Sequence, residues 1–160
     1  MEEIYKEYSK IIYNYLFSLS NNTDIAEELM QETFYSAVKN INKFKNESSL
    51  KTWLCKIAKN KWFDYYKKTK RMKEMQIENF DESYLLANSS EEDYLSKEEL
   101  FNVYKQLHKL DEKSKEVVYL RIGTNLTFKE IGEIMERSEE WAKITFYRAK
   151  IKLKEELKNE

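Results

Sequence analysis

The sequence predicts an all-α fold with two small helical domains joined by a flexible acidic linker. The 160 residues include no proline and only two glycines, so the chain is poorly supplied with residues for tight hairpin turns. Its apolar residues recur instead at helical spacing. Residues 72–99 hold two lysines and nine acidic residues, a balance of −7, so a net charge of −1 leaves +6 for the rest. We therefore expect domains at 1–71 and 96–160 and a linker at 72–95.

Composition argues against several functional classes. No apolar run approaches the roughly 20 residues of a membrane span, and no signal peptide opens the chain, so we expect a cytoplasmic protein without membrane insertion. A single cysteine, Cys55, allows no internal disulfide and no metal cluster. His108 stands alone beside apolar residues, as packing or surface histidines do. With no glycine-rich phosphate loop and no nucleophile–base pair, we expect no cofactor, no metal and no catalysis.

The first two helices are predicted over residues 2–19 and from Thr23 or Asp24 to about residue 40. The second should bury Ile25, Leu29, Phe34 and Val38 or close neighbours. Its polar side would expose an acidic patch near the N-terminus. From the residues alone, this patch is best explained by acids placed favourably against the helix dipole. It consists of Asp24, Glu27, Glu28, Gln31 and Glu32.

A loop over 41–49 carries Phe44, which either packs on the core or meets an unstacked base. Ser48 or Ser49 then begins a third helix, with a buried side predicted at Leu50, Leu54, Ile57, Ala58 and Tyr65. A surface of lysines, an asparagine and aromatics would suit the backbone and splayed bases of a single strand. That surface comprises Lys56, Lys59, Asn60, Phe63 and Lys67.

After the acidic linker, Ser96 and Glu99 have the spacing of a capping box that opens a helix. Residues 107–157 then predict a helix-turn-helix. Thr127 with Glu130 forms a capping box, and Ser138 caps the last helix. The stripe expected to be buried on that helix is Ala142, Phe146, Ala149, Leu153 and Leu157.

The opposite face of the last helix is basic and aromatic. A helix with an apolar back and a basic front suits the major groove, whereas an ordinary bundle with a solvated lysine face is the alternative. The two capped helices, with Gly132 permitting close helix approach, favour DNA binding. The face carries Lys143, Ile144, Tyr147, Arg148, Lys150 and Lys154.

Three motifs, the last in two stretches, resemble the σ70 superfamily of bacterial RNA polymerase initiation factors. Residues 24–34, DIAEELMQETF, are similar to the region 2.2 pattern DAEDLVQETF. Residues 53–65 resemble the WLxxIARNxxIDY pattern of regions 2.3 and 2.4. Residues 110–121 and 126–135 resemble region 4. The order of the motifs and the size of the chain resemble those of the extracytoplasmic-function (ECF) group, whose members keep only regions 2 and 4.

The resemblance implies roles for each surface. Asp24, Glu27, Glu28, Gln31 and Glu32 would contact the β′ clamp helices of core RNA polymerase, whose β flap is a further expected contact. Phe44, Lys56, Lys59, Asn60, Phe63 and Lys67 would recognise and melt the −10 element of promoter DNA. The −35 element would be read by Lys143, Ile144, Tyr147, Arg148 and Lys150, with Arg121 near phosphate. An anti-sigma factor is a further partner class found in such families.

The chain also departs from the family pattern. Trp141 replaces a small residue, Ile144 a polar reader and Thr145 a frequent arginine, so we expect −35 contacts with an unusual preference, in which Ile144 packs on a thymine methyl. Asp111 stands where proline is usual, and aspartate can cap a helix. Two other hypotheses remain: a stand-alone dimeric helix-turn-helix regulator, and a decoy that sequesters polymerase.

Overall fold

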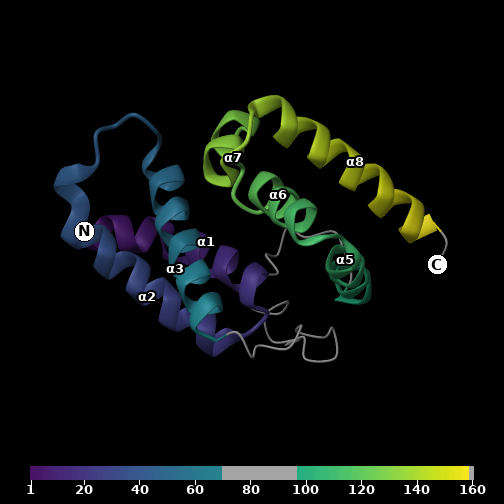
Figure 1. Cartoon of the computed structure of the whole chain (residues 1–160). Helices are drawn as coiled ribbons and strands as arrows, with labels where there is room; N and C mark the ends of the chain where they lie inside the picture. Colours follow the sequence, from purple (N-terminus) through teal and green to yellow (C-terminus); the bar gives the residue numbers. More distant parts are fainter. Residues whose placement is uncertain (70–96, 159–160) are drawn as a thin grey trace.

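The computed structural model describes residues 1–69 and 97–158, and every regular element in these ranges is helical (Figure 1). The first part contains α1 (Glu2–Ser20), α2 (Thr23–Asn40), the short 3-10 helix η1 (Ile41–Lys43) and α3 (Leu50–Lys68). The second contains α5 (Lys97–Lys109), α6 (Glu112–Ile122), α7 (Phe128–Met135) and α8 (Glu139–Lys158). The predicted linker, 72–95, and the predicted cap at Ser96 lie outside the described residues.

Helices α1, α2 and α3 pack against one another around Tyr15, Leu16 and Leu54. The cap of α3 is Ser49, as predicted, and its hydroxyl accepts from the backbone N–H of Thr52. The predicted cap of α2 was wrong. Asn21 adopts a left-handed conformation that ends α1, so Asn22 is the residue whose side chain accepts from the Ile25 N–H.

The buried face of α2 differs in part from the prediction. Leu29 and Phe34 are buried, but Val38 is 49% exposed and Ile25 only partly buried. The small Ala26 and Ala37, with Met30 and Thr33, turn the buried stripe away from Val38. On α3, Leu54 and Ala58 are buried as expected, whereas Leu50, Ile57 and Tyr65 are partly buried. The face also contains Thr52 and Cys55, where burial raises the pKa of the Cys55 thiol to about 12.

The second part is built by capped helices. The Asp111 carboxylate accepts from the Ser114 N–H and begins α6, and Thr127 with Glu130 forms the predicted capping box of α7. Ser138 accepts from the Trp141 N–H at the start of α8. The inner stripe of α8 is buried at Ala142, Phe146 and Ala149 and partly buried at Leu153. Leu157, in the last turn, is 39% exposed, so the predicted stripe ends one position early.

Gly132 permits a close approach, but to a turn rather than to another helix. A Cβ at Gly132 would lie 2.8 Å from the Arg137 carbonyl oxygen. The backbone reverses here through Glu136, which has a φ of 56°, and the Arg137 N–H donates to the Gly132 carbonyl at 2.9 Å. This geometry fixes the tight turn between α7 and α8.

The two parts also pack on each other. Helix α3 contacts α7 and α1 contacts α6, although these helices are far apart in the sequence (Figure 1). No pattern in the sequence predicted this packing. It places one side of α3 against the helix-turn-helix.

Candidate nucleic-acid and polymerase interfaces

Helix α8 presents the predicted basic and aromatic face outward. Its side chains at Lys143, Ile144, Tyr147, Arg148 and Lys150 are all exposed, while the stripe on the opposite side packs against the neighbouring helices. The Tyr147 ring contacts Phe146 at 5.4 Å and Phe128 at 6.1 Å, measured between centroids. One side of that ring is therefore anchored while the other stays accessible. The outer face of α8 therefore presents apolar and basic side chains that could contact the major groove of DNA.

Arg121 of α6 and Trp141 in the first turn of α8 have structural contacts that the sequence did not indicate. Arg121 donates through Nη1 to the Leu126 carbonyl at 2.9 Å, and its guanidinium lies 4.3 Å from the Phe128 ring centroid. Both of these Arg121 contacts are made to residues of the helix-turn-helix. Trp141 is partly buried, with the Arg137 guanidinium 5.6 Å from its ring centroid.

The acidic face of α2 is exposed at each of its five predicted positions, Asp24, Glu27, Glu28, Gln31 and Glu32. It continues toward the C-terminal end of the helix as Tyr35 and Val38, which are exposed apolar side chains. Lys39 lies over the Tyr35 ring at 4.8 Å. Sequence reasoning missed this apolar extension, although Tyr35 and Val38 follow Gln31 at helical spacing.

The predicted basic surface of α3 is divided by the structure. Asn60, Phe63 and Lys67 are exposed, whereas Lys56 and Lys59 are partly buried and face the second part of the chain. Phe44, the aromatic of the preceding loop, packs on Trp53 with centroids 5.1 Å apart and is partly buried. Of the two expectations for Phe44, this packing corresponds to the contact with the core.

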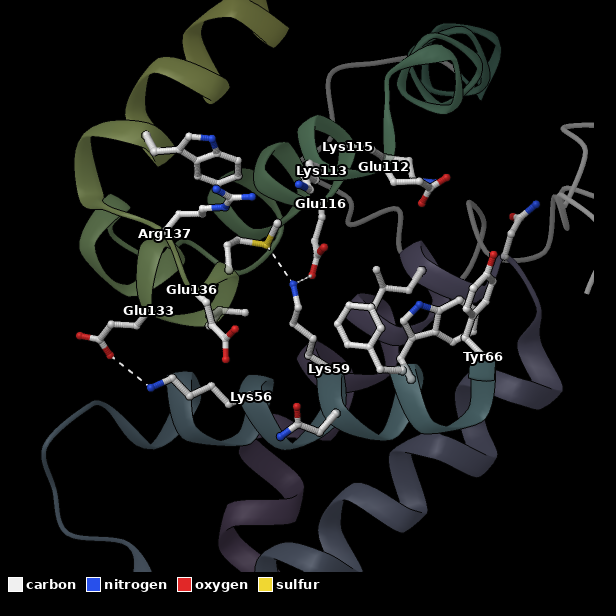
Figure 2. Close-up of a pocket in the computed structure, with 18 of the residues that line it drawn as sticks. Lys56, Lys59, Tyr66, Glu112, Lys113, Lys115, Glu116, Glu133, Glu136 and Arg137 are labelled. Atoms are coloured by element: carbon white, nitrogen blue, oxygen red, sulfur yellow. Dashed lines mark hydrogen bonds and ion pairs between the residues drawn. The ribbon is translucent and has the colours of Figure 1, made fainter. Parts of the chain in front are cut away.

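A cavity of about 980 Å³ lies between α3 and the helix-turn-helix (Figure 2). Among its lining residues, Lys59 Nζ is 3.0 Å from Glu116 Oε1 and 3.2 Å from Met135 Sδ. The buried Tyr15 hydroxyl donates to the same Glu116 oxygen. Burial first, and then the Glu116 charge, raise the Tyr15 pKa well above its ordinary value. Lys56 and Glu133 also line the cavity, with Lys56 Nζ 3.6 Å from Glu133 Oε2.

A second group of polar contacts joins the start of α3 to α7. The Ser49 and Thr52 hydroxyls donate to Glu130 Oε2 at 2.8 and 2.7 Å. Lys51 Nζ donates to the Thr124 carbonyl at 2.9 Å. Burial raises the pKa of Glu130, but hydrogen bonds from Thr52, Ser49 and Thr127 outweigh it and lower that pKa to about 2. The Glu130 carboxylate is therefore charged at neutral pH.

Within residues 1–69 and 97–158, no helix is long and apolar enough to cross a membrane. The same described ranges contain no group of three or more His, Cys, Asp or Glu that could hold a metal ion.

Comparisons with known proteins identify the family of the chain. Residues 4–72 match the family described as Sigma-70 region 2, and residues 106–155 match Sigma-70, region 4. A probable RNA polymerase sigma factor of Haemophilus influenzae is 30% identical over 149 residues, covering 83% of this chain and 77% of that protein. The RNA polymerase sigma factor YlaC of Bacillus subtilis is 29% identical over 158 residues, covering 98% of this chain and 91% of YlaC.

The fold is also similar to a solved sigma factor. The structure of RpoE in complex with the anti-sigma factor NepR, from Bartonella quintana, has a TM-score of 0.74 at 21% identity, covering 99% of this chain and 98% of RpoE. Together the two matched regions and the relatives establish the family. The chain belongs to the σ70 superfamily, in the ECF group of RNA polymerase sigma factors, which direct transcription initiation and are not enzymes.

Proposed function

We propose that this chain reads the −35 promoter element with the outer face of α8 and holds the melted −10 strand against α3. The observation that carries the proposal is the division of α8 into a buried inner stripe and an exposed basic outer face. A helix of this kind enters the major groove, where arginine and lysine meet guanines and phosphates. On α3, Asn60 and Phe63 present a polar and an aromatic group suited to an unstacked base.

We further propose that the acidic face of α2 binds core RNA polymerase at the β′ clamp helices, in the cytoplasm. The exposed carboxylates of this face would meet a basic partner, and the exposed Tyr35 and Val38 would add apolar contact. The β flap and an anti-sigma factor are further proposed partners.

Run-off transcription from a genomic fragment library, with purified chain and sigma-free core polymerase, tests the initiation role. We expect discrete start sites that core alone does not produce.

Arg148→Ala should weaken initiation that depends on a −35 element by about 10-fold or more, consistent with the loss of a bidentate base contact. Lys10→Ala is the control, because it removes one exposed positive charge from α1. Polymerase binding without any specific initiation would indicate a decoy instead.

The polymerase contact is tested by charge reversal. Glu28→Lys with Glu32→Lys, one helical turn apart on α2, should lower affinity for core polymerase while the helical content stays unchanged. Glu3→Lys with Glu7→Lys is the matched control, since these exposed acids have the same spacing on α1. Equal affinities for the two double variants would return the α2 acids to a purely dipolar role.

A further inference from the structure

We propose that Arg121 and Phe128 are positioning residues for recognition of the −35 element, because together they fix the place of Tyr147 on the outer face of α8. The proposal rests on the proposed role of α8 at this element. It adds that Tyr147 contacts a base through its hydroxyl. Arg121, to which the family resemblance gives a place near phosphate, acts instead through Phe128 on that tyrosine.

The three side chains come from three helices and contact one another in sequence. Arg121 belongs to α6, Phe128 is the first residue of α7 and Tyr147 lies in α8. The Arg121 guanidinium lies 4.3 Å from the centroid of the Phe128 ring, within the range of a cation–π contact. The Phe128 and Tyr147 centroids are 6.1 Å apart, with the ring planes at 48°. This separation is that of an attractive aromatic pair, so the contacts connect α6 to the outer face of α8.

Further contacts fix Arg121 and Phe128 themselves. Arg121 donates through Nη1 to the Leu126 carbonyl at 2.9 Å, which holds the guanidinium to the turn before α7. Phe128 also contacts the buried Phe146 ring, with centroids 5.6 Å apart. Only an arginine can place a planar cation on the ring and donate to the carbonyl from the same rigid group, because a lysine ammonium is a single point charge. The Phe128 ring is therefore held against Tyr147.

Tyr147 is the member of this group that a base can reach. It is 46% exposed, and its hydroxyl can both donate and accept a hydrogen bond. Its ring contacts Phe128 at 6.1 Å and Phe146 at 5.4 Å, so two neighbours determine where the hydroxyl points. A hydrogen bond to a base edge depends on distance and angle, so discrimination between bases depends on this placement.

A phosphate role for Arg121 would have a different consequence from a positioning role. A phosphate contact supplies affinity that is the same for every sequence, whereas the placement of a base-reading side chain changes the preference at one base pair. Arg121 is partly buried with its ring face on Phe128, while Lys143 and Arg148 of α8 are exposed. The exposed cations are better placed for the phosphates.

The test uses the full chain with sigma-free core polymerase, on the promoter that gives the strongest start site in the run-off experiment. Each base pair of its −35 element is replaced in turn, and initiation is measured on every template. Tyr147→Phe removes only the hydroxyl and should reduce discrimination at one base pair by about 5-fold. Arg121→Lys and Phe128→Leu should reduce it at the same base pair by a similar factor. Adding either change to Tyr147→Phe should cause no further loss, because all three remove one contact.

Arg137→Lys is the matched control. The Arg137 guanidinium also faces an aromatic ring, 5.6 Å from the Trp141 centroid, and Trp141 lies six residues before Tyr147. This variant should keep the discrimination at every position. Arg121→Gln gives a second measurement, the salt dependence of promoter binding. Loss of a phosphate contact would lower the slope of log affinity against log salt by about 1, whereas a positioning role leaves the slope unchanged.

A loss at one shared base pair, absent in Arg137→Lys and with an unchanged salt slope, supports the proposal. Normal discrimination by Arg121→Lys would overturn it, as would an equal weakening of all templates or an equal loss in the control. Should circular dichroism show that Phe128→Leu loses helix, Arg121→Lys and its combination with Tyr147→Phe decide. The role of α8 is judged separately by Arg148→Ala. If Arg148→Ala loses −35 dependence while Tyr147→Phe discriminates normally, only the positioning proposal fails; if neither variant changes −35 dependence, the proposed function of α8 fails.

Discussion

At the scale of single residues, the pKa of His108 depends on how far the side chain is buried from water. Burial, with a smaller effect of the Lys115 charge, lowers its pKa from 6.5 to about 4. The folded chain binds a proton on His108 less tightly than the unfolded chain does. The contribution of neutral His108 to the free energy of unfolding is therefore complete above pH 6.5. It is lost as the pH falls toward 4.

The chain has one histidine, so its imidazole NMR signals can be assigned without ambiguity. We expect a titration midpoint near pH 4 in the folded chain and near 6.5 in urea. His108→Gln should remove the corresponding part of the pH dependence of unfolding between pH 4 and 6.5. A folded-state midpoint close to 6.5 would show that the imidazole is solvated.

At the scale of elements, the turn between α7 and α8 depends on Gly132. Glycine to alanine inside a helix normally stabilises by up to about 1 kcal/mol. Here the added Cβ would lie 2.8 Å from the Arg137 carbonyl oxygen, and backbone atoms cannot move aside as a flexible side chain can. We therefore expect Gly132→Ala to lower the free energy of unfolding by about 1–3 kcal/mol. Urea unfolding measures this, with Lys129→Ala on the exposed side of α7 as control; a stabilised Gly132→Ala would contradict the tight turn.

Helix α8 allows a prediction about base recognition. Ile144 is 43% exposed on its outer face, where a branched apolar side chain can contact a thymine methyl. Replacing thymine by uracil, one position at a time in the −35 element, should reduce initiation about 4-fold at one position, since a buried methyl contributes about 0.8 kcal/mol. Ile144→Ala should lose this discrimination and keep the remaining −35 dependence. The same thymine preference in both proteins would exclude the Ile144 contact.

At the scale of the whole molecule, local features could be predicted from the sequence and the distant contacts could not. The capping box of Thr127 and Glu130 follows from spacing alone, because both partners lie within one helical turn. The burial expected at or near Val38 falls on Ala37, because helical spacing does not tell how wide the buried stripe is. Glu116 was missed for a different reason. A glutamate is expected at the surface, and its partner Tyr15 is 101 residues away, so no periodicity connects them.

The pairing of Tyr15 with Glu116 predicts how strongly the two parts of the chain support each other. Tyr15→Phe keeps the buried ring and removes the hydroxyl that donates to the carboxylate. Hydrogen bonds to charged groups contribute about 1.5–3 kcal/mol, so the free energy of unfolding should fall by that amount. Tyr66→Phe is the matched control, since its side chain is 51% exposed. Thermal and urea unfolding measure the stability of both variants. Chemical acetylation of Lys59, followed by mass spectrometry, should rise only for Tyr15→Phe, because Glu116 then loses the hydrogen bond that holds it to α1. If the two variants unfold alike and acetylate alike, Glu116 does not join the two parts of the free protein.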